Sequence, residues 1–311
     1  MARKPRVEFA GAFYHVICRG NQRQTIFHSD GDRAHYLDRL EHYRERYEFT
    51  VYAYVLMANH VHLLLETGRV PLSKIMQGLQ FTYTGYYNRK YDKVGHLFQG
   101  RYKAILCDRD SYLLELVRYL HLNPARLRHP LDPWRYRWSS HGAYVGKDSP
   151  VKVETSVVLG QLGTVVANAR RGYLRFMAEG KELGHQENYY RTVDQRFLGD
   201  ERFVEQIEQR SPAEREIEVP GPTASFSDLV RLLGEEYGVD ARELLRAGRK
   251  RQWVRARSML VYLAREWGTM SVKELGRRLH RDPSIISRLY AAYAASRDVK
   301  AESRLAKQLR Q

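Results

Sequence analysis

Residues 52–66 run Tyr52-Ala53-Tyr54-Val55-Leu56-Met57-Ala58-Asn59-His60-Val61-His62-Leu63-Leu64-Leu65-Glu66. Two stretches rich in β-branched, aromatic and aliphatic residues flank a break at residues 57–59, which predicts two adjoining strands. Side chains alternate between the faces of a strand, so His60 and His62 are expected on one face of the second strand. Two imidazoles on one face can reach a single metal ion. A polar patch at the end of a sheet is the alternative interpretation of the same pattern.

Strands and helices alternate in the pattern on both sides of this stretch. Further strands are predicted at residues 13–18 and 95–107, and helices at residues 29–47, 71–90 and 112–122. The resulting order, β-α-β-β-α-β-α, is typical of an α+β domain with an antiparallel, ferredoxin-like sheet. Two of the helices are expected to cover one sheet face. The last helix is then free to lie near the strand that carries the histidines.

The charge balance favours a polyanionic partner. The 311 residues include 52 Lys and Arg against 36 Asp and Glu, a formal net charge of +16, with 22 tyrosines. Nucleic acid is the usual partner of a chain with such a surplus, although an ordinary basic protein is the alternative. A hydrophobic content of 43% supports a folded core and excludes a disordered chain.

Cysteines and apolar stretches exclude several other classes of protein. Cys18 and Cys107 are far apart and form no C-x-x-C pair, which argues against a disulfide framework or a structural zinc cluster. No apolar stretch reaches the roughly 18–20 residues needed to cross a bilayer, and residues 1–6 lack a signal-peptide core. We therefore expect a cytoplasmic protein with no membrane partner and no small-molecule cofactor.

Breaks in the pattern predict three regions. Ser211-Pro212 and Val219-Pro220-Gly221-Pro222 have the composition of a linker. The predicted regions are a catalytic domain at residues 1–145, a helical connector at 146–222 and a helix-turn-helix domain at 223–311. No chemistry is identifiable in the connector.

Three motifs in the first region resemble a known family when they are taken together. They are Asn59-His60-Val61-His62-Leu63-Leu64, Gly100-Arg101-Tyr102-Lys103, and Val117-Arg118-Tyr119-Leu120-His121-Leu122-Asn123-Pro124. This combination, within about residues 7–144, resembles the HUH single-tyrosine transposases and, more narrowly, their REP-associated branch in bacteria. The resemblance implies a ferredoxin-like fold, a divalent metal ion at His60 and His62, and nucleophilic attack by Tyr119 on single-stranded DNA. It also implies association with the nucleoid.

Tyrosine suits the chemistry that this resemblance implies. Cleaving a phosphodiester through a covalent intermediate needs a nucleophile that is also a tolerable leaving group, and a phenol with a pKa of about 10 meets this need. The phosphotyrosine conserves the energy of the bond, so the same site can rejoin strands without ATP. Tyr112, two turns earlier on the same predicted helix, is the nearest rival to Tyr119.

Two imidazoles alone would hold Mg²⁺ or Mn²⁺ loosely, so a third ligand and water are expected. Asn123 follows Tyr119 by one helical turn and could offer an amide oxygen. Relatives often carry Gln at this step, and a helix cap before Pro124 is an equal alternative for Asn123. The basic residues predicted to contact phosphate around the site are Arg19, Arg101, Lys103 and Arg118, with solvated surface charge as the alternative.

The carboxyl-terminal region predicts a second DNA-binding element. Two short helices, one starting near Ser271 and one near Ser284, are joined by a tight turn as in a helix-turn-helix. Residues 226–290 resemble the DNA-binding domain of DnaA, although Asp282-Pro283-Ser284 replaces an Asp-His-Thr type signature, and a helical dimerisation bundle is the alternative. We expect Arg249, Lys250 and Arg251 to contact phosphates, and Ser284, Ser287 and Arg288 to lie nearest the bases.

The sequence as a whole predicts a metal-dependent endonuclease and strand transferase. It would act on hairpin-forming, REP-like DNA with a single-stranded flank, through a 5′-phosphotyrosine at Tyr119. One alternative is a catalytically silent regulator derived from a transposase. Another is an initiator of rolling-circle replication or plasmid transfer, against which the absence of a helicase motif counts. The choice between monomer and homodimer stays open.

Overall fold

The chain folds into two compact units, residues 1–219 and 220–311. The structure is a computed structural model, and it describes residues 7–182, 192, 196–209, 224–246, 248, 250–268 and 270–309. Each unit has its own hydrophobic core, and each is described below by itself.

The first unit is built on a sheet of strand order β2-β3-β1-β4-β5. The strands are β1 (Phe13–Arg19), β2 (Thr50–Leu56), β3 (His60–Glu66), β4 (Lys103–Cys107) and β5 (Phe197–Leu198). β1 pairs antiparallel with β3 and β4, and β2 pairs antiparallel with β3. This is the predicted ferredoxin-like arrangement, so the α+β fold is confirmed. The two-residue β5 adds a parallel edge beside β4, and its length explains why no periodic pattern marks it.

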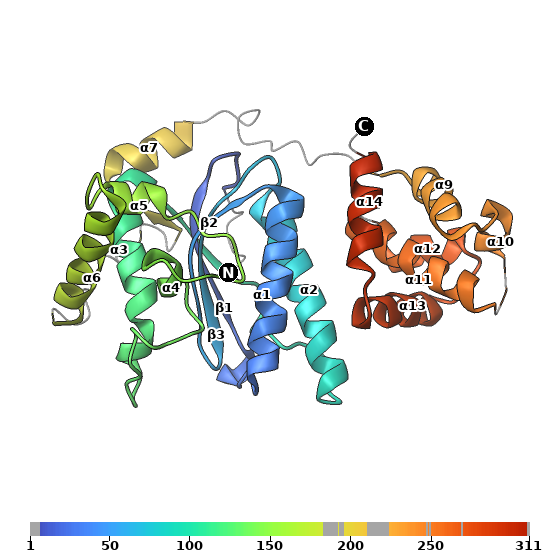
Figure 1. Ribbon diagram of the computed structural model, residues 1–311, viewed down its shortest axis with the longest axis horizontal. Coiled ribbons are helices and arrows are strands. Elements are labelled where there is room, and N and C mark those ends of the chain that lie inside the picture. Colours follow the sequence, from blue (N-terminus) through green and yellow to red (C-terminus); the bar gives the residue numbers. More distant parts are fainter. Residues whose placement is uncertain are drawn as a thin grey trace. The chain divides into compact units, whose positions relative to one another are not determined.

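Helices α1 (Asp30–Tyr47) and α2 (Leu72–Lys90) cover one face of the sheet (Figure 1). Ser29 caps α1 through a capping box with Asp32, and Pro71 precedes α2, as the sequence predicts. Buried tyrosine and aliphatic side chains of both helices pack on Val16, Val61 and other residues of the same sheet face. A short 3₁₀ turn, η1 (Asn21–Arg23), follows β1.

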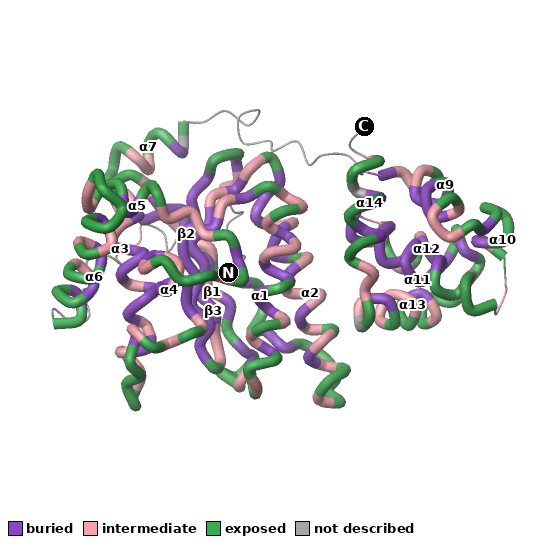
Figure 2. The backbone as a smooth tube through the Cα atoms, in the orientation of Figure 1, coloured by how far each residue is buried: buried purple, intermediate pink, exposed green. Residues whose placement is uncertain are grey.

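The opposite face of the sheet is covered by α3 (Arg109–Leu122) and the segments that follow it. These are η2 (Asn123–Arg126), α4 (His141–Tyr144), α5 (Ser156–Gly160) and α6 (Val166–Glu182). Tyr144 and Tyr173 are fully buried among α3 and sheet residues. Figure 2 shows buried stretches along α3 and the sheet strands. The described part of the predicted connector, residues 146–222, is thus packed into the first unit, because its apolar side chains complete the core on this face.

Two predicted boundaries differ from the structure. The predicted strand at residues 95–107 is reduced to β4, since Gly100 has a φ of 63° and the residues around it form bends. α3 begins earlier than the predicted residue 112 because the Asp108 carboxylate accepts the hydrogen bond that caps the helix, from the backbone N–H of Asp110. Neither difference moves Tyr119.

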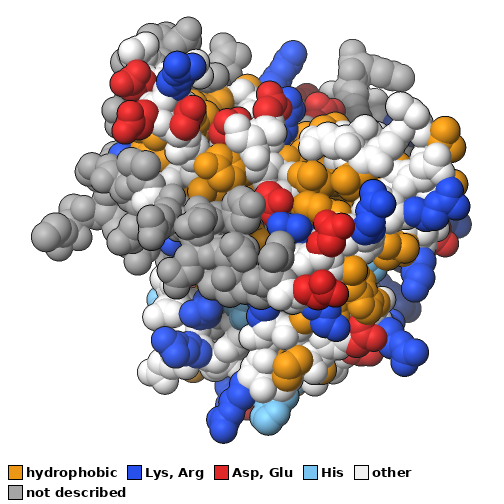
Figure 3. All heavy atoms as spheres, turned by 90° about the vertical axis from the view of Figure 1, so that its left-hand side faces the viewer, with side chains coloured by type: hydrophobic (Ala, Val, Ile, Leu, Met, Phe, Trp, Pro, Cys, Tyr) orange, Lys and Arg blue, Asp and Glu red, His pale blue; other side chains and the backbone are white. Residues whose placement is uncertain are grey.

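The outer side of the first unit, near α6 and α7 (Glu201–Gln209), mixes charges of both signs. Figure 3 shows Lys and Arg side chains interleaved with Asp and Glu, with hydrophobic side chains between them. The part of this face that is visible is therefore not a uniformly basic surface of the kind that DNA selects.

The second unit is all-helical. Its described helices are α9 (Phe226–Tyr237), α10 (Ala241–Leu245), α11 (Arg251–Glu266), α12 (Val272–Arg278), α13 (Pro283–Ala295) and α14 (Val299–Leu309). α11 is the central helix, buried along residues 256–264. α12, a four-residue turn and α13 form the predicted helix-turn-helix, with Ser271 and Asp282 capping the two helices. None of the described helices combines the length and apolar character needed to cross a membrane.

Candidate active site

The two histidines of β3 lie on the sheet face that α3 covers. Val61, Leu63 and Leu65 point to the α1–α2 side, where they join that core, so alternation directs His60 and His62 to the other side. Their ring centroids are 5.0 Å apart. His62 is buried and His60 is half-buried, so one imidazole of the pair stays open to solvent.

One nitrogen of each ring is already engaged. Nδ1 of His60 lies 2.7 Å from Oδ1 of Asn59, and Nδ1 of His62 lies 2.9 Å from Nε2 of His15 on β1. An amide oxygen only accepts, so His60 donates from Nδ1 and its Nε2 is the acceptor nitrogen. If His62 donates in the same way, its Nε2 is also an acceptor. Such bonds orient metal-binding histidines in proteins.

The histidines of this cluster favour their neutral form. Burial, together with the charge of Arg19, lowers the pKa of His60 to about 4. Burial and the neighbouring imidazoles and Arg19 hold the pKa of His62 well below its usual value, and burial with Lys103 lowers that of His15 to about 3. A neutral imidazole is the form that binds a metal ion.

Tyr119 reaches this cluster from α3. Its ring centroid lies 5.9 Å from those of both His15 and His62. The residue is half-buried at the edge of the core on this face and is not fully enclosed in it. The predicted proximity of Tyr119 to a histidine of the pair is thus present, and the geometry joins β1, β3 and α3 at one point.

The structure places Asn123 at the end of α3, where it is the C-cap residue. Its amide nitrogen donates to the carbonyl oxygen of Tyr119 at 3.2 Å, which is the capping alternative considered from the sequence. This bond uses the Nδ2 group, and an amide oxygen is the group a hard cation would take. Its role as a metal ligand stays a prediction.

Arg118, one of the predicted phosphate contacts, has a side chain that is buried inside the first unit. Its side chain is buried, forms an ion pair with Glu115 and stacks on Phe176 of α6, with the guanidinium carbon 4.1 Å from the ring centroid. The guanidinium therefore joins α3 to α6 and is not available to DNA. Charge alone made this residue resemble a surface arginine.

The other predicted phosphate contacts of the first unit are exposed. Arg19 ends β1 opposite His60, and Lys103 begins β4 opposite Ile17. Both act on the pKa values of the cluster, so both lie near it. Arg101 is exposed in the loop before β4. The cluster thus has positive charge beside neutral imidazoles, a setting that suits a phosphate group.

The predicted metal ligands are His60, His62 and Asn123. Among the described residues, no group of three or more His, Cys, Asp and Glu side chains converges on one point. The imidazoles of His60 and His62 offer at most two nitrogen ligands, so a bound ion would take the rest of its shell from water, DNA oxygens or Asn123. Two imidazoles are too few for a closed structural zinc site, and an Mg²⁺ or Mn²⁺ ion would need mostly oxygen ligands beside them, so the metal stays a prediction.

Sequence reasoning missed two residues of the cluster. The sequence pattern places His15 in a strand and indicates no role for it, and it gives no role to Arg126. The Arg126 guanidinium carbon lies 4.7 Å from the centroid of the Tyr119 ring, within range of a cation–π contact. Alternation in the first strand could have placed His15 on one sheet face, but nothing local to residues 13–19 pairs it with His62.

The predicted DNA contacts of the second unit are at its surface. Lys250 and Arg251 are exposed, with the Lys250 amine 4.6 Å from the Trp253 ring centroid, and Arg249 lies outside the described residues. Ser284, Ser287 and Arg288 are exposed at the amino-terminal end of α13. That end of the second helix is the part of a helix-turn-helix that contacts base edges.

Comparison with known proteins agrees with both parts of this description. Residues 9–123 match the family profile of IS200-like transposases, and residues 227–291 match that of the bacterial DnaA helix-turn-helix. The resemblances predicted from the sequence are therefore confirmed for these two ranges, which support a transposase-like, DNA-binding chain. No curated protein matches the chain.

A solved structure is also similar to it, that of a REP-associated tyrosine transposase bound to a REP hairpin. The match has 13% sequence identity and a TM-score of 0.40, and it covers 50% of this chain and 92% of the other.

Proposed function

We propose that this protein is a metal-dependent endonuclease and strand transferase for single-stranded DNA. The observation that carries the proposal is the position of the Tyr119 ring, half-buried and 5.9 Å from the ring of His62, on one face of the sheet. The match of residues 9–123 to IS200-like transposases supports it independently.

In this mechanism the Tyr119 hydroxyl is the nucleophile. Its oxygen loses the proton to solvent and forms a bond to the scissile phosphorus, while the 3′ oxygen leaves and takes up a proton. The product is a 5′-phosphotyrosine, and attack by another 3′ hydroxyl reverses the step and joins strands. Arg19 and Lys103, whose charges lower the pKa values of His60 and His15, would hold the phosphate.

His60 and His62, with Asn123 as a third candidate, would hold a divalent ion, Mg²⁺ or Mn²⁺, whose charge stabilises the phosphate oxygens. Asn59 and His15 keep the two rings oriented for this role through their bonds to Nδ1. The low pKa of His60 keeps it neutral, hence able to bind, throughout the physiological pH range.

The second unit would bind the double-stranded stem of a hairpin. Lys250 and Arg251 would contact phosphates, and Ser284, Ser287 and Arg288 would reach base edges from α13. The match of residues 227–291 to the DnaA helix-turn-helix supports a role of the second unit in binding double-stranded DNA. A REP-like palindrome with a short single-stranded flank is a substrate class that offers a double-stranded stem to the second unit and a single strand to the first.

A library of DNA hairpins with randomised single-stranded flanks tests the activity. The protein is incubated with the labelled library and Mn²⁺, and covalent adducts are separated on a denaturing gel and sequenced. We expect an adduct from the wild type and from Tyr112→Phe, and none from Tyr119→Phe or after addition of a chelator. Retained hairpin binding with no adduct from the wild type would instead favour a silent DNA-binding regulator.

A further inference from the structure

Arg126 has a donor group that nothing in the described protein satisfies. It ends η2, and its guanidinium carbon stacks 4.7 Å from the centre of the Tyr119 ring. Its Nη1 atom is buried and has no hydrogen-bond partner among the described residues. A buried donor without a partner is unfavourable, more so when it is charged, so this nitrogen would gain from an acceptor that a ligand brings.

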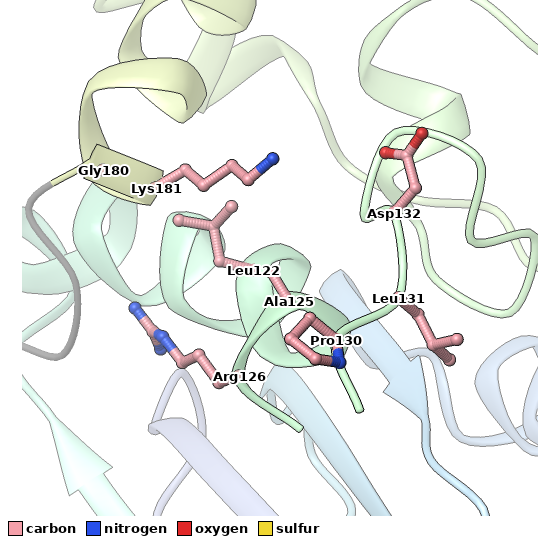
Figure 4. Close-up of a pocket in the computed structure, with 8 residues that line it drawn as sticks. All are labelled: Leu122, Ala125, Arg126, Pro130, Leu131, Asp132, Gly180 and Lys181. Carbon is pink, nitrogen blue, oxygen red and sulfur yellow. The ribbon is translucent and has the colours of Figure 1, made fainter. Parts of the chain in front are cut away.

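The same arginine lines a pocket of about 410 Å³. Figure 4 shows Leu122 at the end of α3 between Lys181 and Arg126; its side chain forms the floor of the pocket and is almost fully buried. The remaining lining residues are Ala125, Pro130, Leu131, Asp132 and Gly180. The volume falls within the range of about 300–1,000 Å³ that is usual for small-molecule sites.

The chemistry of the lining has two ends. Ala125, Pro130 and Leu131 provide apolar surface that can take the face of a flat ring, whereas Arg126 provides a cationic fork that suits a phosphate. The Asp132 carboxylate, on the far side from Arg126 in Figure 4, disfavours a phosphate there, and the Lys181 amine that extends toward that side offsets the negative charge. A ligand with an anion at one end and a planar apolar group at the other fits this distribution.

We propose that Arg126 and this pocket bind one unpaired nucleotide of the DNA strand next to Tyr119. The guanidinium holds the phosphate of that nucleotide against the phenol, and the pocket takes its base out of the stack. This inference rests on the proposed function, since the role of Tyr119 makes the pocket adjacent to the point of cleavage. Holding a base in this way fixes which phosphate the phenol meets.

The test measures binding and not cleavage. Hairpins selected from the library for binding to the Tyr119→Phe protein are remade with a single abasic site at each flank position in turn. Affinities are measured by fluorescence anisotropy without metal. We expect one position at which loss of the base weakens binding about tenfold, in line with roughly 1–3 kcal/mol per stacked base.

Filling the pocket should remove that sensitivity. In the Tyr119→Phe background, Ala125→Phe should weaken binding of the intact hairpin about tenfold, and the abasic site should then have no further effect. Ala167→Phe, which adds the same bulk on the exposed surface of α6, is the matched control. Equal sensitivity of the Ala125→Phe and Ala167→Phe proteins to the abasic site would overturn the proposal.

Arg126→Gln tests the phosphate end, with the exposed Arg128→Gln as its control. In the protein with Arg126, a neutral methylphosphonate at the contacted flank position should weaken binding. We expect Arg126→Gln to weaken binding of the unmodified hairpin and to make the methylphosphonate at that position have no further effect. Lower thermal stability with unchanged DNA affinity would show that Arg126 only supports Tyr119, and would refute its phosphate contact. If the wild type forms no adduct but still binds less tightly when the base at one flank position is removed, the proposed function is wrong and the nucleotide site is supported.

Discussion

The imidazoles of His15 and His62 are joined by a hydrogen bond of 2.9 Å between Nε2 of the first and Nδ1 of the second. Both rings are buried, and burial lowers both pKa values, so both are neutral at pH 7. In a neutral pair one ring donates and the other accepts. The bond therefore couples the tautomer of His62 to a residue on the neighbouring strand, and with it the choice of which nitrogen of His62 carries the proton.

Replacing His15 should weaken metal binding without removing a ligand. His15→Leu leaves Nδ1 of His62 without its partner, and losing such a partner typically costs about 10–100-fold in metal affinity. Calorimetric titration with Mn²⁺ measures this without depending on cleavage. His15→Gln, which can replace Nε2 with an amide group, should retain most of the affinity. Unchanged Mn²⁺ affinity in His15→Leu would mean that His15 does not orient a metal ligand.

The sequence predicts which residues of one strand share a sheet face, but it does not predict which residues of other strands and helices meet them. Strand alternation is a local property, so it put His60 and His62 on one face correctly. The partner of His62 depends on the pairing of β1 with β3, 47 residues apart, which no local pattern encodes. Tyr119 was placed by its motif, and the free sheet face left room for its helix.

Arg118 shows why charged residues are difficult to place from sequence. Its ring partner, Phe176, is on α6, 58 residues away. The packing also requires a small residue at Gly180, where an added Cβ would lie 2.3 Å from Cδ of Arg118. The helical pattern of α6 predicts a helix but not the sheet face it covers, so the segment was assigned to a connector.

Arg118→Met should destabilise the first unit and leave its phosphate contacts intact. The substitution removes the ion pair with a largely buried Glu115 and the stack on Phe176, and a charge-assisted hydrogen bond of this kind contributes about 1.5–3 kcal/mol. Urea denaturation should show a loss in that range. Arg175→Met, whose pair with Glu179 is exposed, should change the free energy of unfolding by less than about 0.5 kcal/mol. A weaker salt dependence of DNA binding in Arg118→Met would instead restore the predicted phosphate contact.

Acid should destabilise the first unit through a second histidine network. Tyr173 on α6 accepts or donates hydrogen bonds to His121 and His141, at 2.8 and 2.7 Å. Burial, assisted by Lys147, lowers the pKa of His141 to about 4. The unfolded state then binds a proton at His141 more tightly than the folded state does. The stability that neutral His141 contributes is therefore complete above pH 6.5 and is lost as the pH falls towards 4. The slope from this residue is at most about 1.4 kcal/mol per pH unit.

His141→Asn isolates this effect, because asparagine can keep the bond to Tyr173 but does not titrate. Hydrogen exchange in peptides of α6 at different urea concentrations reports the stability of this unit between pH 7.5 and 4.5. We expect the variant to lose stability less steeply with acid than the wild type does. His129→Asn, at an exposed position, should follow the wild-type curve. Identical slopes for both variants would exclude His141 as a source of acid sensitivity.

Lys250→Ala should reduce the salt dependence of binding to duplex DNA. The lysine is exposed beside Trp253 at the start of α11, and a single phosphate contact contributes about 0.9 to the slope of log K against log salt concentration. The slope for a mixed-sequence duplex, measured with the full-length protein, should become shallower by about that amount. Lys307→Ala, exposed on α14, changes the net charge equally and should leave the slope unaltered. Equal slopes in the two variants would place Lys250 away from the DNA backbone, and the contact would then have to be sought among the residues of α12 and α13.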